Sequence, residues 1–154
     1  MRIGNTHYRS IWMEKDPAVI KVIDQRKLPF EFKVVKLESV KDAFEAIADM
    51  VVRGAPLIGV TAAYGIYLAA LKSGPDRWCE EVQSACENLK LARPTAVNLE
   101  YAVDLGLSEV NCAGSREGMI DRLFHLAARL TEEEVDRCRR IGEHGLSLIK
   151  DLFK

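Results

Sequence analysis

Two arginines in this sequence lie shortly before prolines that are suited to open helices. Arg53 begins the segment Arg-Gly-Ala-Pro at the head of an apolar run, and Arg93 directly precedes Pro94. Proline is favoured at the first position of a helix because an N–H there has no intrahelical acceptor. The free N–H groups and the positive end of the helix dipole attract anions, and a guanidinium matches phosphate or carboxylate oxygens. The chemistry that this pattern predicts is anion binding.

The first of these segments has the fuller set of features. With Pro56 as the first helical residue, the N–H groups of Leu57 and Ile58 are expected to be free just inside the helix. Gly54 has no Cβ, so an anion can approach the backbone there. If the two helices pack side by side, the two arginines form a two-sided clamp. The alternative, which the residues alone leave open, is that one or both make surface salt bridges.

The histidines and the acidic turn residue favour structural roles. His144 follows Glu143 between two glycines, whose small size permits close packing, so we expect a structural or interface role. His125 lies among apolar residues, and we expect a half-buried ring with its hydrogen bonds satisfied. Asp24 opens a turn that ends in proline, and we expect its carboxylate to bond the backbone of that turn.

The four cysteines are Cys79, Cys86, Cys112 and Cys138. They form no C-x-x-C pair and have no histidine at zinc-finger spacing, so reduced thiols in a cytoplasmic protein are the simplest interpretation. Cys79 and Cys86 share a helix face, as expected for core packing. No Ser-His-Asp or Cys-His arrangement, P-loop or dinucleotide motif is found. The sequence therefore predicts no metal, no cofactor and no catalytic residue. An anion clamp can bind a substrate, but catalysis also needs an acid, a base or a nucleophile.

Composition excludes several classes of function. The 154 residues are enough for one domain with a core, and the formal net charge of −1 argues against nucleic-acid binding. The first residues are not followed by the apolar segment of a signal peptide. Residues 54–71 are largely apolar, but glycine, proline and threonine interrupt them, so we expect a buried helix rather than a membrane span.

The elements that must hold the two arginines are a small sheet followed by helices. Three short strands are expected from apolar segments bounded by turn residues, at 8–13, 18–24 and 31–37. Helical spacing then predicts helices over 40–51 with Ser39 as the cap, 56–71, 76–89, 94–107, 116–129 and 132 to near the end. Thr131 and Glu134 match a capping box for the last of these. The prediction is an α+β fold, with an antiparallel meander over 1–38 and a helical bundle over 39–154 forming one domain.

The last predicted helix is still apolar where a free terminus usually becomes polar, with Ile141, Leu146, Ile149 and Leu152. This pattern predicts a partner domain or docking on another subunit, and an ordinary terminal core helix is the alternative.

Four blocks carry a family resemblance, and they occur at 23–29 (Ile-Asp-Gln-Arg-Lys-Leu-Pro), 53–60 (Arg-Gly-Ala-Pro-Leu-Ile-Gly-Val), 93–99 (Arg-Pro-Thr-Ala-Val-Asn-Leu) and 141–145 (Ile-Gly-Glu-His-Gly). In this order they resemble the amino-terminal half of the methylthioribose-1-phosphate isomerases of methionine salvage, over essentially the whole chain. The same superfamily holds ribose-1,5-bisphosphate isomerases and regulatory subunits of the translation-initiation exchange factor. The Asp-Gln-x-x-Leu-Pro block favours the first group.

The resemblance implies that Arg53, Gly54, Ala55 and Arg93 contact a sugar phosphate. It implies an aldose–ketose isomerisation from methylthioribose 1-phosphate to methylthioribulose 1-phosphate, without a redox cofactor, in a homodimer. The cysteines, the charge balance and the interrupted apolar run add the expectation of a cytoplasmic protein that binds neither nucleic acid nor membrane. In the family the catalytic cysteine, in a Thr-His-Cys-Asn-Ala-Gly motif, and the catalytic aspartate belong to a following Rossmann-like domain. Residues 1–154 contain no such motif. We therefore expect this chain alone to be inactive, and the alternatives are a regulatory or assembly module and a ribose-1,5-bisphosphate isomerase.

Overall fold

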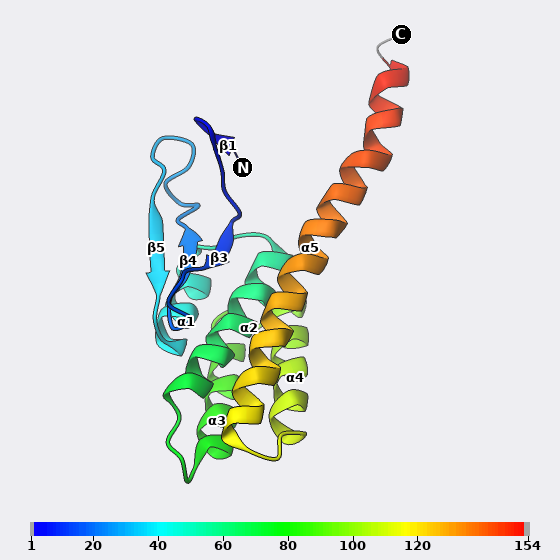
Figure 1. Cartoon of the computed structure of the whole chain (residues 1–154). Helices are drawn as coiled ribbons and strands as arrows, with labels where there is room; N and C mark the ends of the chain where they lie inside the picture. Colours follow the sequence, from blue (N-terminus) through cyan, green and yellow to red (C-terminus); the bar gives the residue numbers. More distant parts are fainter. Residues whose placement is uncertain (1, 153–154) are drawn as a thin grey trace.

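The computed structural model describes residues 2–152, apart from the side chains of residues 2 and 151, and its fold is α+β, as predicted (Figure 1). The strands are β1 (Arg2–Ile3), β2 (Thr6–His7), β3 (Ile11–Met13), β4 (Ile20–Ile23) and β5 (Val34–Leu37). The last three form the predicted antiparallel meander in the order β3-β4-β5. The pairing of β1 with β2 is a separate hairpin that the sequence pattern did not indicate.

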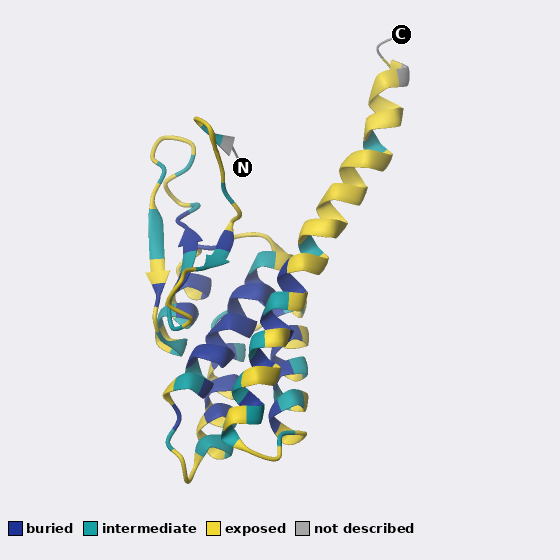
Figure 2. Ribbon diagram, viewed as in Figure 1, coloured by how far each residue is buried: buried dark blue, intermediate teal, exposed yellow. Residues whose placement is uncertain are grey.

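The helices are α1 (Val40–Ala48), α2 (Ala55–Lys72), α3 (Trp78–Lys90), α4 (Val97–Asn111) and α5 (Arg116–Leu152). Helix α2 is buried on nearly all sides and lies in the middle of the bundle (Figure 2). Its length and mean hydropathy of 1.3 would allow it to cross a membrane, but 67% of it is buried inside the protein. Strands and helices share one apolar core, since Ile20 and Leu37 join the same cluster as residues of α2.

The start of α1 was predicted correctly. Ser39 is its N-cap, and the Ser39 hydroxyl accepts a hydrogen bond from the Asp42 N–H at 3.2 Å. The same hydroxyl donates to the Asp42 carboxylate at 2.8 Å. The helix ends at Ala48, earlier than expected, and the chain then turns through Met50, which has a positive φ of 57°.

The prediction that Pro94 opens a helix is wrong. Helix α4 begins at Val97, and Ala96 is its N-cap. Pro94 instead lies in a turn that is closed by a hydrogen bond from the Ala96 N–H to the Arg93 carbonyl at 2.9 Å. Arg93 therefore precedes the helix by a full turn of irregular chain rather than standing directly at its end.

The prediction of two helices at the C-terminus is also wrong, because α5 runs without a break from Arg116 to Leu152. Thr131 does not cap a new helix. Its hydroxyl donates to the Ala127 carbonyl at 2.8 Å and contacts the Tyr64 hydroxyl at 3.4 Å. A threonine that bonds the carbonyl four residues earlier is compatible with a continuous helix, so the capping-box pattern here has no capping role.

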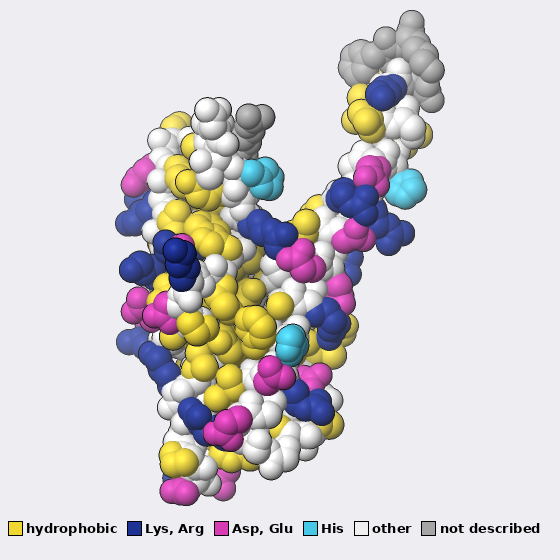
Figure 3. All heavy atoms as spheres, viewed as in Figure 1, with side chains coloured by type: hydrophobic (Ala, Val, Ile, Leu, Met, Phe, Trp, Pro, Cys, Tyr) yellow, Lys and Arg dark blue, Asp and Glu magenta, His cyan; other side chains and the backbone are white. Residues whose placement is uncertain are grey.

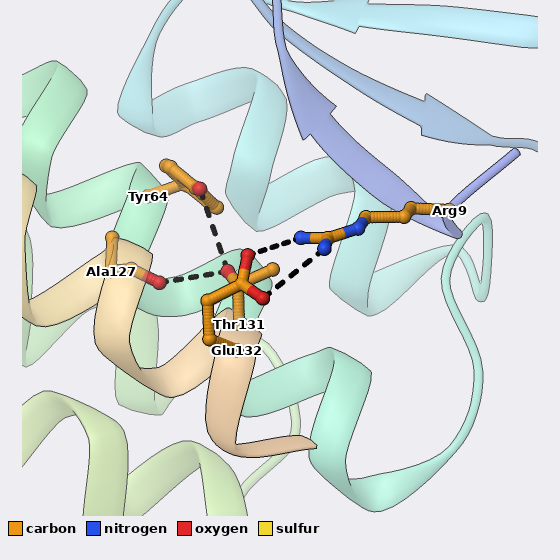
Figure 4. Close-up of polar contacts among 5 residues, drawn as sticks. All are labelled: Arg9, Tyr64, Ala127, Thr131 and Glu132. Atoms are coloured by element: carbon orange, nitrogen blue, oxygen red, sulfur yellow. Dashed lines mark hydrogen bonds and ion pairs between the residues drawn. The ribbon is translucent and has the colours of Figure 1, made fainter. Parts of the chain in front are cut away.

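Helix α5 packs along the bundle in its first half and extends beyond the bundle in its second half (Figures 1 and 2). Near the point where it leaves, Arg9 and Glu132 form an ion pair between the segment before β3 and α5 (Figure 4). The pair raises the pKa of Arg9 and lowers that of Glu132. We call residues 132–152 the arm. Its surface carries a mixture of basic and acidic side chains with scattered apolar ones (Figure 3).

Candidate functional site

The start of α2 provides free backbone donors. Gly54 is the N-cap, so the helix begins at Ala55, one residue before the predicted start, and Pro56 is the second helical residue. The Ile58 N–H donates to the Gly54 carbonyl at 3.1 Å, so the prediction that it is free is wrong. Ala55 and Leu57 are the first-turn residues whose N–H groups lack an intrahelical acceptor.

Gly54 has a conformation that few other residues adopt. Its φ is +92°, in the region that favours glycine, and a Cβ built there would have no heavy atom within 4 Å. The open space beside this backbone is the property expected of a residue that an anion approaches closely.

The loop before α2 is held by a residue that the sequence analysis did not select. The Arg53 N–H donates to Oε1 of Gln25 at 3.0 Å, and the Gln25 N–H donates to the Val51 carbonyl at 2.9 Å. Gln25 therefore joins the turn after β4 to the loop that carries Arg53. Its place in one of the four family blocks was the signal that the sequence offered. A hydrogen bond between residues 28 apart leaves no repeating pattern in the local sequence.

Asp24, beside Gln25, is buried and satisfied within its own turn, as predicted. Its carboxylate accepts from the Arg26 N–H at 3.1 Å and from the Arg26 guanidinium in two hydrogen bonds of 2.9 Å each. This guanidinium lowers the pKa of Asp24. Asp24 is thus an ionised residue that stabilises the turn.

The starts of α2 and α4 lie in contact. A Cβ built on Gly59, in the second turn of α2, would lie 2.7 Å from the carbonyl oxygen of Asn98, in the first turn of α4. Because α3 returns the chain between them, α2 and α4 run in the same direction and begin at the same end of the bundle (Figure 1). Their positive dipole ends therefore point the same way.

Neither the Arg53 nor the Arg93 guanidinium has a hydrogen-bond or ion-pair partner among residues 2–152. Other arginines do have partners: Arg122 pairs with Glu109 at 2.8 Å, and Arg116 donates to the Ser73 carbonyl at 3.0 Å. The surface salt bridges that were the alternative for Arg53 and Arg93 are therefore absent from the described part of the chain. Arg53 is exposed and Arg93 is half-buried.

A cavity of about 310 Å³ lies between the starts of α2 and α4 and the base of the arm. Helix α2 contributes Pro56, Gly59 and Val60 to its wall. The other two helices contribute the remaining lining residues: Val97, Asn98, Tyr101, Ala102, Leu130, Glu133, Glu134 and Arg137. None of the predicted site residues lines this cavity: Arg53, Gly54, Ala55 and Arg93 are all outside the lining. Three of them directly precede Pro56, which is part of it.

The remaining candidates divide between exposed and buried positions. The prediction of a half-buried His125 is wrong, since its side chain is 68% exposed and its Nε2 lies 3.4 Å from Oδ1 of Asp121. His144 lines a shallow hollow on the arm with two arginines.

Cys86 is buried as predicted, and burial raises its pKa to about 12. Within residues 2–152, no three His, Cys, Asp or Glu side chains are grouped so that they could hold a metal ion.

Comparison with known proteins extends over the whole chain. The methylthioribose-1-phosphate isomerase of Desulfatibacillum aliphaticivorans is 42% identical over 156 aligned residues, which cover 100% of this chain and 42% of that protein. The chain thus spans about two-fifths of the length of the curated relatives that it matches. These relatives confirm the resemblance that the four sequence blocks indicated.

Two solved structures have the same fold. The 5-methylthioribose 1-phosphate isomerase of Pyrococcus horikoshii matches with a TM-score of 0.82 and 33% identity, over 89% of this chain and 39% of that one. The delta subunit of translation initiation factor eIF-2B from A. fulgidus matches with a TM-score of 0.84 and 35% identity, over 92% of this chain and 42% of that one. Residues 51–153 match the initiation factor 2 subunit family. The chain therefore belongs to the initiation factor 2 subunit family.

Proposed function

We propose that this chain is the amino-terminal, substrate-binding part of an isomerase that converts methylthioribose 1-phosphate to methylthioribulose 1-phosphate. The observation that carries the proposal is the pair of arginines without partners, Arg53 and Arg93, at the end of the bundle where α2 and α4 begin. The names of the relatives supply the identity of the substrate.

In this proposal the phosphate binds at the start of α2. The N–H groups of Ala55 and Leu57 donate to its oxygens, Gly54 leaves room for it, and Arg53 and Arg93 neutralise its charge. The phosphate on C1 blocks the anomeric oxygen, so catalysis must assist ring opening as well as move hydrogen between C1 and C2. Binding the phosphate fixes the sugar for both steps.

The groups that carry out the chemistry lie outside this chain in our proposal. Asp24 is engaged by Arg26, and Cys86 is a buried thiol with a pKa of about 12, so neither is an available acid, base or nucleophile. We propose that a following Rossmann-like domain supplies the catalytic residues, and that the complete protein works as a cytoplasmic homodimer.

The arm supports the proposal of a further domain. Its large apolar residues are between 42% and 82% exposed, and they are Val135, Ile141, Leu146, Leu148, Ile149 and Leu152. At about 100° per residue these side chains fall on one face of the helix, whereas Asp136, Arg140 and Glu143 fall on the other. Glu134 is the charged residue that interrupts this face near its base. An exposed helix face that carries several large apolar side chains is suited to burial against protein.

Two glycines in the middle of this face fit the same role. Gly142 and Gly145 have no atom near the position of a Cβ, although glycine within a helix costs about 1 kcal/mol relative to alanine. Close approach of another backbone would account for both. We propose that the remaining three-fifths of the complete protein covers this face.

A second candidate function is a regulatory or assembly module. The match to the eIF-2B delta subunit favours it, because that structure fits this chain as well as the isomerase does. Fold alone does not separate the two functions, whereas the relatives named as isomerases cover the whole chain at about 42% identity. A ribose-1,5-bisphosphate isomerase is a third candidate that would use the same arginines for a ligand with a second phosphate.

The test is binding and turnover with purified protein. We expect the 154-residue chain to bind methylthioribose 1-phosphate weakly and to show no turnover. Turnover by this chain would contradict the assignment of catalysis to a following domain. Absence of any sugar-phosphate binding, together with a reading frame that lacks Thr-His-Cys-Asn-Ala-Gly downstream, would favour the module instead.

A further inference from the structure

The cavity beside the phosphate-binding end of α2 has a wall that the proposed phosphate site does not use. Helix α4 contributes Val97 and Tyr101 to this wall, and these residues are 75% and 58% exposed, whereas Leu99 and Val103 on the same helix are in the core. Large apolar residues that line a concave surface are typical of ligand sites. The volume of about 310 Å³ lies at the lower end of the range for such sites, about 300–1,000 Å³.

The opposite wall of the cavity carries charges that are already paired. The base of the arm contributes Glu133 and Glu134, which pair with Arg129 and Arg137 on the same helix. Arg137 is itself in the lining, and because each of these charges has a partner, the wall has no unpaired cation to hold a phosphate. The paired carboxylates can still accept hydrogen bonds from sugar hydroxyls, and the Asn98 amide, also in the lining, both donates and accepts.

Charge therefore orients a ligand that has one anionic end. The cations without partners, Arg53 and Arg93, are outside the cavity lining, three residues before Pro56 and four residues before Val97, the first residue of α4. We infer that the cavity takes the uncharged end of the substrate, with its apolar substituent against Val97 and Tyr101. This inference rests on the proposed function and deepens it, because it assigns specificity for the apolar group to α4.

Tyr101 is the residue that tests the inference. Its exposure means that substitution leaves the core intact, and Tyr101→Phe keeps the ring while removing the hydroxyl. Leu148→Ala is a matched control, because Leu148 is 70% exposed on the arm and is not part of the cavity lining. Binding is measured by amide chemical shifts of the 154-residue chain with methylthioribose 1-phosphate, ribose 1-phosphate and inorganic phosphate.

The unaltered chain is expected to bind methylthioribose 1-phosphate about tenfold more tightly than ribose 1-phosphate, which carries a hydroxyl in place of the methylthio group. Tyr101→Ala removes this preference and leaves the affinity for inorganic phosphate unchanged, whereas Tyr101→Phe and Leu148→Ala retain it. The inference is overturned if Tyr101→Ala keeps the preference, or if the unaltered chain has none. If neither sugar phosphate binds more tightly than inorganic phosphate, the proposed function itself fails, and this assignment fails with it.

Discussion

Gln25 and Arg53 are joined by a hydrogen bond of 3.0 Å, in which the Arg53 N–H donates to the Gln25 side-chain oxygen across a separation of 28 residues. Since the Gln25 N–H also bonds the Val51 carbonyl, two hydrogen bonds join the turn after β4 to the loop before α2. The direction in which the Arg53 side chain leaves the backbone therefore depends on Gln25. A residue in the sheet region positions a cation of the proposed phosphate site.

Replacement of Gln25 by alanine should loosen this loop. One hydrogen bond to a backbone N–H contributes about 0.5–1.5 kcal/mol net, so we expect a loss of that size in the free energy of unfolding, together with weaker phosphate binding. Gln83→Ala is the matched control, because Gln83 bonds Asn111 at 2.9 Å on the surface, far from the site in sequence. Equal phosphate affinity in the two variants would argue against a positioning role for Gln25.

Removal of either free arginine should weaken ligand binding without affecting stability. Arg53→Ala and Arg93→Ala each lose a charge-assisted bond worth about 1.5–3 kcal/mol, which is roughly a ten- to 150-fold increase in the dissociation constant for the sugar phosphate. Neither guanidinium has a partner within residues 2–152, so thermal unfolding should be unchanged. Arg122→Ala, which breaks an ion pair with Glu109, is the control that should leave binding intact. Wild-type affinity in both variants would refute the clamp.

Asp24 should make stability depend on pH in the acid range. Because Arg26 lowers the pKa of Asp24 in the folded state, the stabilisation is complete above the ordinary carboxyl pKa and is lost as pH falls through the lowered value. Asp24→Asn should cost about 1–2 kcal/mol near neutral pH, since Arg26 is partly screened by solvent, and the difference from the unaltered chain should shrink toward pH 2. Chemical unfolding across this range measures it. A difference that does not vary with pH would exclude the ion pair as its cause.

Two glycine substitutions should have opposite effects. Gly59→Ala introduces a Cβ 2.7 Å from the Asn98 carbonyl oxygen, a backbone atom that can move only if α2 and α4 separate, so we expect a loss of about 1–3 kcal/mol. Gly142→Ala meets no atom within 4 Å and should stabilise the isolated chain by about 0.5–1 kcal/mol through helix propensity. Denaturant unfolding distinguishes the two signs. If Gly142→Ala destabilises this chain, the glycine must have a packing role inside the chain itself rather than against another protein surface.

The cysteines should differ sharply in reactivity. Cys112 and Cys138 are exposed, whereas Cys86 is buried with its pKa raised to about 12, so it has almost no thiolate at neutral pH. A thiol reagent should label the two exposed residues rapidly in the native chain and Cys86 only after unfolding. Rapid native labelling of Cys86, identified by peptide mass, would mean that the helical core opens readily.

Local patterns in the sequence were sufficient where the stabilising contacts are themselves local. The Ser39 cap was predicted because its hydrogen bond joins residues three apart, and Asp24 was assigned to its own turn because its partner is two residues away. The strands of the meander followed from short apolar segments between turns. The two arginines were selected because helix starts, prolines and glycines have a recognisable local chemistry.

Tertiary structure decided the features that depend on residues far apart. Thr131 has the local pattern of a cap, yet α5 continues through it, and here the helix contacts Tyr64 of α2 and Arg9 before β3 (Figure 4). Pro94 has the local pattern of a helix start, yet the chain completes a turn before α4 begins. The link from Gln25 to Arg53 and the cavity between α2, α4 and the arm exist only because separate elements pack together. A local pattern states which conformations a segment can adopt, and the packing energy of its distant neighbours selects one of them.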